Sequence, residues 1–285
     1  MLARGQSAEI PGRDLLTFPL GLTAEAAAIG QQSGTGFWNP ATAVLSRDSR
    51  WRLSASAMNT SQDIGISAQI FSVAALWRET TLGISVARAS VADLLRTDAD
   101  PLSIGNEILY ATTVISGVAV RRLAPKVVAG VSVRTRSGQL DNITLTGTSV
   151  DVGVLAEHLT RYDVRLGAST FLLSLFGKER ERASYLAGAD ARVAGSDSLL
   201  AVRAGYGLVA TPGASAEHYV FVSGRWRRWE ARGGPVKTDI YGSSNLRLRL
   251  GVALHNAGYA LGFSREESAN GLSPTYHFSI STVLK

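Results

Sequence analysis

The sequence predicts an all-β protein: a transmembrane antiparallel up-and-down β-barrel of about fourteen strands with an N-terminal plug segment. Three observations lead to this fold class. From about Trp51 onward, apolar and polar residues alternate with a period of two, and sustained helical periodicity is nearly absent. Short and long connections between these segments alternate along the chain. One face of each alternating segment is aliphatic, whereas the other is rich in glycine and arginine.

Residues 15–45 do not alternate, and we expect residues 1–48 to form a plug or hatch and residues 49–285 to form the barrel. Thr23 is a candidate cap for a short helix through the alanine run "AEAAAIG". The glycines and the proline that follow then favour a compact, irregular path. A segment this apolar is expected to pack into the mouth of the barrel.

Fourteen segments from residue 50 onward are predicted to be strands, with ends uncertain by a few residues. They are 50–58, 65–77, 80–90, 107–121, 126–137, 148–158, 163–173, 182–193, 198–210, 217–226, 229–236, 245–254, 258–266 and 274–284. The prolines after residue 51, including Pro235, fall in predicted loops or at strand ends, where their missing N–H is harmless. The eleventh segment, "WEARGGPV", is the weakest, and the count drops to twelve or thirteen without it.

The predicted connections place tight turns on one rim of the barrel and longer loops on the other, as in bacterial outer-membrane barrels. The longer connections are 59–64, 91–106, 138–147, 174–181, 211–216, 237–244 and 267–273. An even number of strands returns the C-terminus to the rim of tight turns, where the first strand begins.

The stretch "LRLRLGVALH", residues 246–255, shows which face is which. Leu248 and Leu250 are expected to face lipid, and Arg247 and Arg249 an interior. Glycines lie nearly always on the polar face, where a water-exposed surface would favour Lys, Glu and Thr, so a crowded lumen explains them best. Aromatic residues at segment ends suit interfacial girdles, with ordinary strand aromatics as the alternative.

Composition excludes several function classes. The chain has 285 residues, 45% hydrophobic and 18% charged, and no cysteine, which excludes a disulfide scaffold, a thiolate zinc site and a cysteine nucleophile. The net charge is +6, but the basic residues are scattered without a basic run, so no nucleic-acid partner is expected. No apolar window of about 18 residues predicts a membrane-spanning helix.

The N-terminal residues "MLARGQSAEIPGRDLLTF" lack the apolar region of a signal peptide. If the protein is exported, we expect this sequence to be a mature form or the true start to lie upstream of Met1. Otherwise the protein is intracellular.

No catalytic constellation can be recognised in the sequence, and a Ser/His/Asp set assembled inside a barrel stays an open alternative. The four histidines lie on different segments without metal-ligand spacing, and neither a nucleophile elbow nor paired carboxylates occur. The protein is therefore predicted not to be an enzyme, with no cofactor and no metal site.

Inward arginines are the most informative polar residues, because guanidinium groups bind carboxylates or phosphates in a bidentate manner. The arginines assigned to a lumen ligand site are Arg134, Arg203, Arg247 and Arg249. The alternative, which we favour, is that these inward arginines pair with Asp151, Asp190 and the plug, because buried charges need partners.

Two motifs carry a family resemblance. The segment "GTGFWNPATAVL", with Asn39-Pro40-Ala41, and the segment "TSVDVGVLAEH" at 148–158 resemble FadL-like outer-membrane proteins, especially the PorV/PorQ branch. The resemblance implies a fourteen-stranded barrel whose lumen is plugged by the N-terminal segment. It also implies that Asn39 and Pro40 fix the turn of the plug and that Asp151 lies inside the sixth strand. The residues assigned to the plug are Phe37, Trp38, Asn39 and Pro40.

Two departures leave the branch of that family open. The usual double glycine before the signature is "AIGQQ" here, and the chain ends in Val283-Leu284-Lys285 without a terminal aromatic residue.

The function predicted is that of a channel in the outer membrane of a Gram-negative bacterium, for passive uptake of hydrophobic or amphipathic small molecules similar to long-chain fatty acids. Its partners would be outer-membrane lipid and a hydrophobic ligand. The first alternative is a non-transporting accessory or shuttle protein for secreted cargo, similar to PorV in type IX secretion, with secretion-system proteins as partners. The second alternative is a soluble β-rich binding protein in which the two faces are exchanged.

Overall fold

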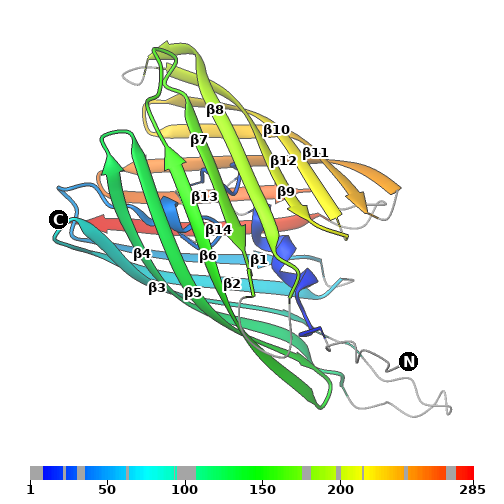
Figure 1. The fold of residues 1–285 in the computed structure, drawn as a ribbon. Coiled ribbons are helices and arrows are strands. Elements are labelled where there is room, and N and C mark those ends of the chain that lie inside the picture. Colours follow the sequence, from blue (N-terminus) through cyan, green and yellow to red (C-terminus); the bar gives the residue numbers. More distant parts are fainter. Residues whose placement is uncertain are drawn as a thin grey trace.

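The protein is a closed antiparallel β-barrel in which each strand pairs with its neighbours in sequence and the first strand pairs with the last (Figure 1). The computed structural model describes residues 9–21, 24–30, 36–61, 64–92, 94, 107–174, 181–196, 200–213, 215–240, 243–267 and 274–285. The strands are β1 Trp51–Asn59, β2 Ile66–Trp77, β3 Thr80–Val91, β4 Tyr110–Ala124, β5 Val127–Leu140, β6 Ile143–Ala156, β7 Arg165–Phe171, β8 Ser184–Ser196, β9 Leu200–Thr211, β10 Ser215–Trp226, β11 Trp229–Ile240, β12 Ser243–Asn256, β13 Tyr259–Glu266 and β14 Thr275–Leu284.

The predicted antiparallel barrel of fourteen strands is confirmed, and all fourteen predicted segments contain a strand. The weak eleventh segment is β11, a strand longer than expected. Pro235 was predicted at a strand end, and this is wrong: it lies inside β11, paired with Leu248 of β12. On its other side the β10–β11 register skips from the Tyr219–Val236 pair to the Val222–Gly233 pair. Proline is tolerated there because that stretch of the ladder is already interrupted.

The two rims differ in loop length, but less regularly than predicted. Turns at 78–79, 125–126, 227–228 and 257–258 lie on the rim where β14 ends, which we call the short-turn rim. The long connections expected at 138–147, 211–216 and 237–244 are wrong, because β5, β6, β9, β10, β11 and β12 extend into them. Residues 157–164 form a longer connection on the short-turn rim.

The outer face of the barrel is aliphatic and the inner face is polar, as the alternation predicts. Leu248 and Leu250 are 38% and 44% exposed, whereas Arg249 is 2% exposed. Exposed Ile84, Val133 and Val222 continue the apolar outer face on other strands. The alternative with exchanged faces is therefore wrong. This arrangement suits a hydrocarbon surrounding, because every lipid-facing position alternates with an interior one.

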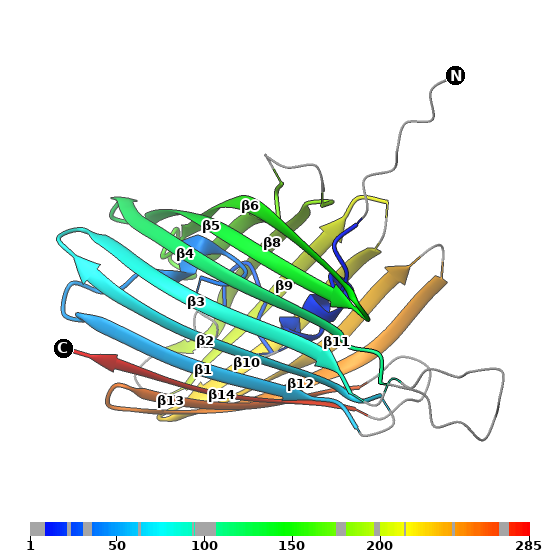
Figure 2. The same ribbon diagram turned by 90° about the horizontal axis from the view of Figure 1, so that it is seen from below.

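The described parts of residues 10–45 run inside the barrel, where Figures 1 and 2 show them in blue between the strands. They include two short 3-10 helices, η1 Asp14–Gly21 and η2 Pro40–Ala43. The helix predicted in the alanine run is wrong: residues 24–30 form bends and turns, and Thr23 lies outside the described residues. Within the described parts of the chain, no helix is long and apolar enough to cross a membrane.

Inward glycines make room for this N-terminal segment. A Cβ atom on Gly130 of β5 would lie 2.6 Å from the backbone of Pro40 and Ala41, and one on Gly153 of β6 would collide with the Asn39 side chain. Gly207 and Gly251 approach Ala26 and Ala24 in the same way. The crowded lumen inferred from the glycine pattern is therefore present, and it consists of the protein's own backbone.

Candidate functional site in the barrel lumen

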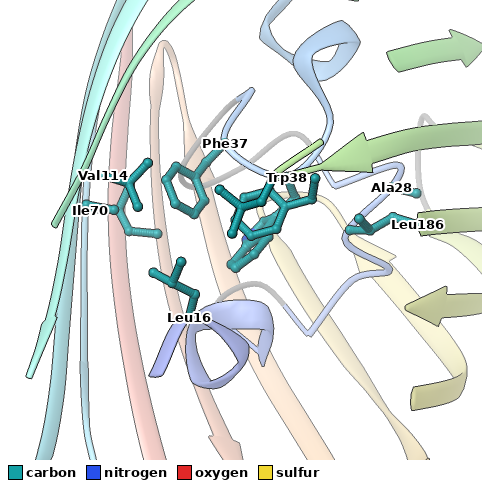
Figure 3. Packing of buried hydrophobic residues seen from close by; sticks show 10 residues of the cluster. Leu16, Ala28, Phe37, Trp38, Ile70, Val114 and Leu186 are labelled. Carbon is teal, nitrogen blue, oxygen red and sulfur yellow. The ribbon is translucent and has the colours of Figure 1, made fainter. Parts of the chain in front are cut away.

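An apolar cluster lies at the centre of the lumen, between the N-terminal segment and the wall (Figure 3). Phe37 and Trp38 pack edge to face with ring centroids 4.8 Å apart, and Phe171 at the end of β7 lies 4.8 Å from Trp38. Leu16 of η1 and wall residues such as Ile70 and Val114 surround these rings. Phe37 is fully buried, so this cluster joins the N-terminal segment to the wall.

Arg134 of β5 is the predicted arginine that joins this cluster. Its guanidinium pairs with Asp151 of β6, and neither side chain is exposed to solvent. It also donates to the carbonyl oxygen of Phe37 and lies 5.0 and 4.8 Å from the ring centroids of Phe37 and Phe171. Asp151 in turn accepts from the backbone N–H of Leu173 at 3.1 Å. The pairing with Asp151 that we favoured is confirmed.

Arg203 of β9 belongs to a second, separate group of charges. It pairs with Asp163 at 2.6 Å and with Asp190 of β8 at 2.7 Å. Arg165 of β7 also pairs with Asp190, and it reaches Glu25 of the N-terminal segment at 3.1 Å. The predicted pairing with Asp190 is confirmed.

Asp163 lies outside the strands, in the connection between β6 and β7. Burial acts to raise the pKa of its carboxyl group, but hydrogen bonds from Arg203 and His158 outweigh this and hold the pKa below its ordinary value.

Arg247 and Arg249 of β12 form a third group. Both share Glu217 of β10 and Glu266 of β13, with N–O distances between 2.5 and 3.0 Å. Arg249 also lies 4.7 Å from the ring centroid of Tyr219. The four predicted arginines therefore do not form one site, and each already has carboxylate partners.

Several polar side chains hold the N-terminal segment to the wall. Asn39 caps η2 through Ala41, and its Nδ2 donates to the carbonyl oxygens of Ala28 and Val154 at 2.6 and 3.1 Å. Tyr219 donates to Ala24, and Ser169 donates to Trp38. The predicted plug residues Phe37, Trp38, Asn39 and Pro40 are thus all buried and lie next to one another. Whether they act as a plug is considered below as a proposal.

A row of serines crosses the part of the wall formed by β14 and β1–β4. Ser281, Ser54, Ser72, Ser85 and Ser116 come from β14, β1, β2, β3 and β4, and each is the direct cross-strand partner of the next. We call this set the serine row. Two neighbouring polar side chains, Ser56 and His277, are almost fully buried, and their polar atoms have no hydrogen-bond partner among the described residues.

Arg52 of β1 differs from the predicted arginines. It lies beside the serine row, on the inward face between Val283 and Ala74. Its Nη1 is buried without a hydrogen-bond partner, and no carboxylate within the described ranges lies at ion-pair distance. Arg52 is not among the site residues that the sequence predicts, because alternation shows which face a residue takes and not which residues surround it.

These features define a class of protein: a transmembrane β-barrel with an apolar outer face and a charged, partly filled lumen. No family model and no curated protein matches the sequence.

Solved structures share the fold over nearly the whole chain. The CymD monoaromatic hydrocarbon channel matches with a TM-score of 0.63 at 13% identity, covering 97% of each chain. The Pseudomonas putida toluene transporter TodX matches with a TM-score of 0.54 at 12% identity, covering 98% of each chain. A TodX variant, described as a monoaromatic hydrocarbon channel, matches at 0.53 and 12% identity, covering 86% of this chain and 91% of that chain. At such identities the likeness establishes the fold.

Proposed function

We propose that this protein is an outer-membrane channel of a Gram-negative bacterium for passive uptake of hydrophobic or amphipathic small molecules. The observation that carries the proposal is a closed barrel with an aliphatic outer face. Its lumen contains an aromatic cluster and a row of small hydroxyl side chains. The shared fold with the hydrocarbon channels CymD and TodX supports it. The PorV/PorQ branch and the accessory function in secretion stay predictions.

The N-terminal segment acts as the plug of this channel. Its backbone fits against inward glycines on β5, β6 and β9, and Asn39, Phe37 and Glu25 bind the neighbouring wall strands β6, β5 and β7. Because these contacts combine close packing with buried ion pairs, the segment stays in place while a solute passes.

The solute passes along the serine row, between the plug and the wall formed by β14 and β1–β4. Serine is among the smallest polar side chains, so these wall positions fill less of the lumen than the arginines do. Ser56 and His277 offer unused hydrogen-bonding atoms to a solute with a hydroxyl or carboxyl group. An aromatic body would meet the Phe37, Trp38 and Phe171 rings.

The ion-paired arginines serve mainly to hold the interior together, and Arg52 is a better candidate for an anionic anchor. A ligand carboxylate at Arg247 or Arg249 would compete with Glu217 and Glu266, whereas one at Arg52 would meet a guanidinium without a carboxylate partner. The anchor role predicted for Arg134, Arg203, Arg247 and Arg249 stays untested.

Uptake of labelled toluene by a Gram-negative host that expresses the protein tests the proposal. We expect a faster initial rate than in cells without the protein. The variant Ser54→Leu/Ser72→Leu should lower that rate at least severalfold, because two bulky side chains fill the path, whereas Ser54→Ala/Ser72→Ala should keep it.

Correct folding of each variant is checked by heat-modifiable gel mobility. If the folded wild-type protein gives no increase in uptake, or if the leucine and alanine variants behave alike, the proposed route is wrong. Capture of a secreted protein together with unchanged uptake would select the accessory function.

A further inference from the structure

The β10–β11 turn carries the sequence "RWRRW", residues 225–229, in which basic and aromatic residues are interleaved. Trp226 and Trp229 are direct cross-strand partners and are 55% and 56% exposed. They lie at the end of the apolar outer face on the short-turn rim, as do exposed Trp51 and Trp77. Indole rings at this level suit the boundary between hydrocarbon and headgroups.

The three arginines of this hairpin line a cavity of about 410 Å³ together with His255, Tyr259 and Ser281. This cavity lies on the lumen side of the hairpin, because Arg225 and Ser281 take inward positions on β10 and β14, whereas Arg227 and Arg228 form the turn itself. No aspartate or glutamate contributes to the lining. Within the part of the chain that the structure describes, Arg225, Arg227 and Arg228 have no carboxylate at ion-pair distance. Their charge is therefore available to a ligand.

Arg121 and Arg122 on the same rim differ in this respect. Arg121 pairs with Glu79 at 3.3 Å, and Arg122 approaches Glu157 at 4.0 Å. Arg78 lies 5.0 Å from the centroid of the Trp77 ring, as Arg227 lies 5.2 Å from that of Trp226. The RWRRW hairpin thus combines cations without carboxylate partners with exposed indoles, and Arg227 and Arg228 lie in the turn between Trp226 and Trp229.

We propose that the RWRRW hairpin binds the phosphate headgroup of an anionic phospholipid in the leaflet that meets the short-turn rim. Guanidinium groups bind phosphate in a bidentate manner, and cations just beyond the hydrocarbon edge attract anionic lipids. The acyl chains would follow the aliphatic outer face below Trp226 and Trp229. The inference requires that the barrel lies in a membrane, but it does not require transport.

Native mass spectrometry of the purified barrel tests this with phosphatidylglycerol, phosphatidylcholine of the same acyl chains, and inorganic phosphate as separate additions. We expect phosphatidylglycerol to bind about tenfold more tightly than phosphatidylcholine, and Arg225→Gln/Arg227→Gln/Arg228→Gln to abolish this preference. The control Arg78→Gln/Arg121→Gln/Arg122→Gln removes the same charge from the same rim and should keep the preference within about twofold.

Folding of both triple variants is checked by heat-modifiable mobility. If the hairpin variant does not fold, Arg227→Gln in the exposed turn replaces it, with an expected loss of about threefold. Equal binding of the two lipids, or an equal loss in the control, overturns the proposal. Inorganic phosphate bound as tightly as phosphatidylglycerol would assign the site to a soluble anion and would also overturn it.

Discussion

The buried pair Arg134–Asp151 allows a stringent test of how the lumen is held together. Asp151→Asn changes the charge with almost no change in shape, and the amide oxygen can still accept from the N–H of Leu173. It leaves a guanidinium with no exposed surface and no counter-charge. Breaking one side of such a pair costs about 3–5 kcal/mol. Because the Phe37 and Phe171 rings still face the Arg134 cation and partly stabilise it, we expect the free energy of unfolding to fall by about 3 kcal/mol, at the lower end of that range.

The matching variant Arg134→Met leaves Asp151 as the unpaired charge, and we expect a similar loss of about 3 kcal/mol. In Arg134→Met/Asp151→Asn neither charge remains. The free energy of unfolding of the double variant should then fall by no more than about 2 kcal/mol, which is the contribution of the hydrogen bond to Phe37 and of the ring contacts. The coupling energy of the cycle is therefore expected to be about 4 kcal/mol.

Urea-induced unfolding from phospholipid vesicles, followed by tryptophan fluorescence and gel mobility, provides the three free energies of unfolding. If the double variant loses the sum of the two single losses, the charges do not stabilise one another and the reasoning is refuted.

Two further predictions concern charges at other places in the barrel. Arg52→Ala should lower the initial uptake rate of benzoate severalfold and leave that of toluene within about twofold. Arg247→Ala should change both rates alike, because Arg247 is already paired with a carboxylate. Equal losses for the two solutes in Arg52→Ala would rule out the anchor role of Arg52. Asp163→Asn should destabilise the protein at neutral pH, because hydrogen bonds from Arg203 and His158 hold the pKa of Asp163 below its ordinary value of 3.8. That stabilisation is present above the ordinary pKa and is lost as the pH falls through the lowered pKa. The difference in free energy of unfolding between wild type and variant should therefore shrink below about pH 4. A constant difference from pH 7 to pH 3 would contradict this prediction.

The strands and their faces could be predicted because both are local properties. A strand in a bilayer must turn every second side chain to lipid, so the pattern of Leu248, Arg249 and Leu250 already implies their exposures. The errors lie where this constraint ends. In residues 138–147 the alternation of apolar and polar residues fades, but the ladder of backbone hydrogen bonds continues to the turn at 141–142. Loss of the apolar–polar alternation therefore does not by itself indicate a loop.

The N-terminal segment shows the same limit. Its apolar character and the row of glycines pointed to a packed interior, yet the alanine run is not a helix. Ala24 has a φ of +49°, and the carbonyls of Ala24 and Ala28 accept from Tyr219 and Asn39. Helix propensity is a weak preference, and hydrogen-bonding groups of the barrel wall outweigh it here.

By itself, the sequence determined that this chain closes into a barrel with aliphatic side chains outside and guanidinium groups inside. Only the tertiary structure decided which arginines are neutralised. Glu217 and Glu266 reach Arg249 from strands on either side of β12, and Glu25 reaches Arg165 from the N-terminal segment, while Arg52 has no carboxylate at ion-pair distance among the described residues. The physical reason is that an ion pair depends on a few ångströms in space, and barrel closure and register set those distances between residues far apart in the chain.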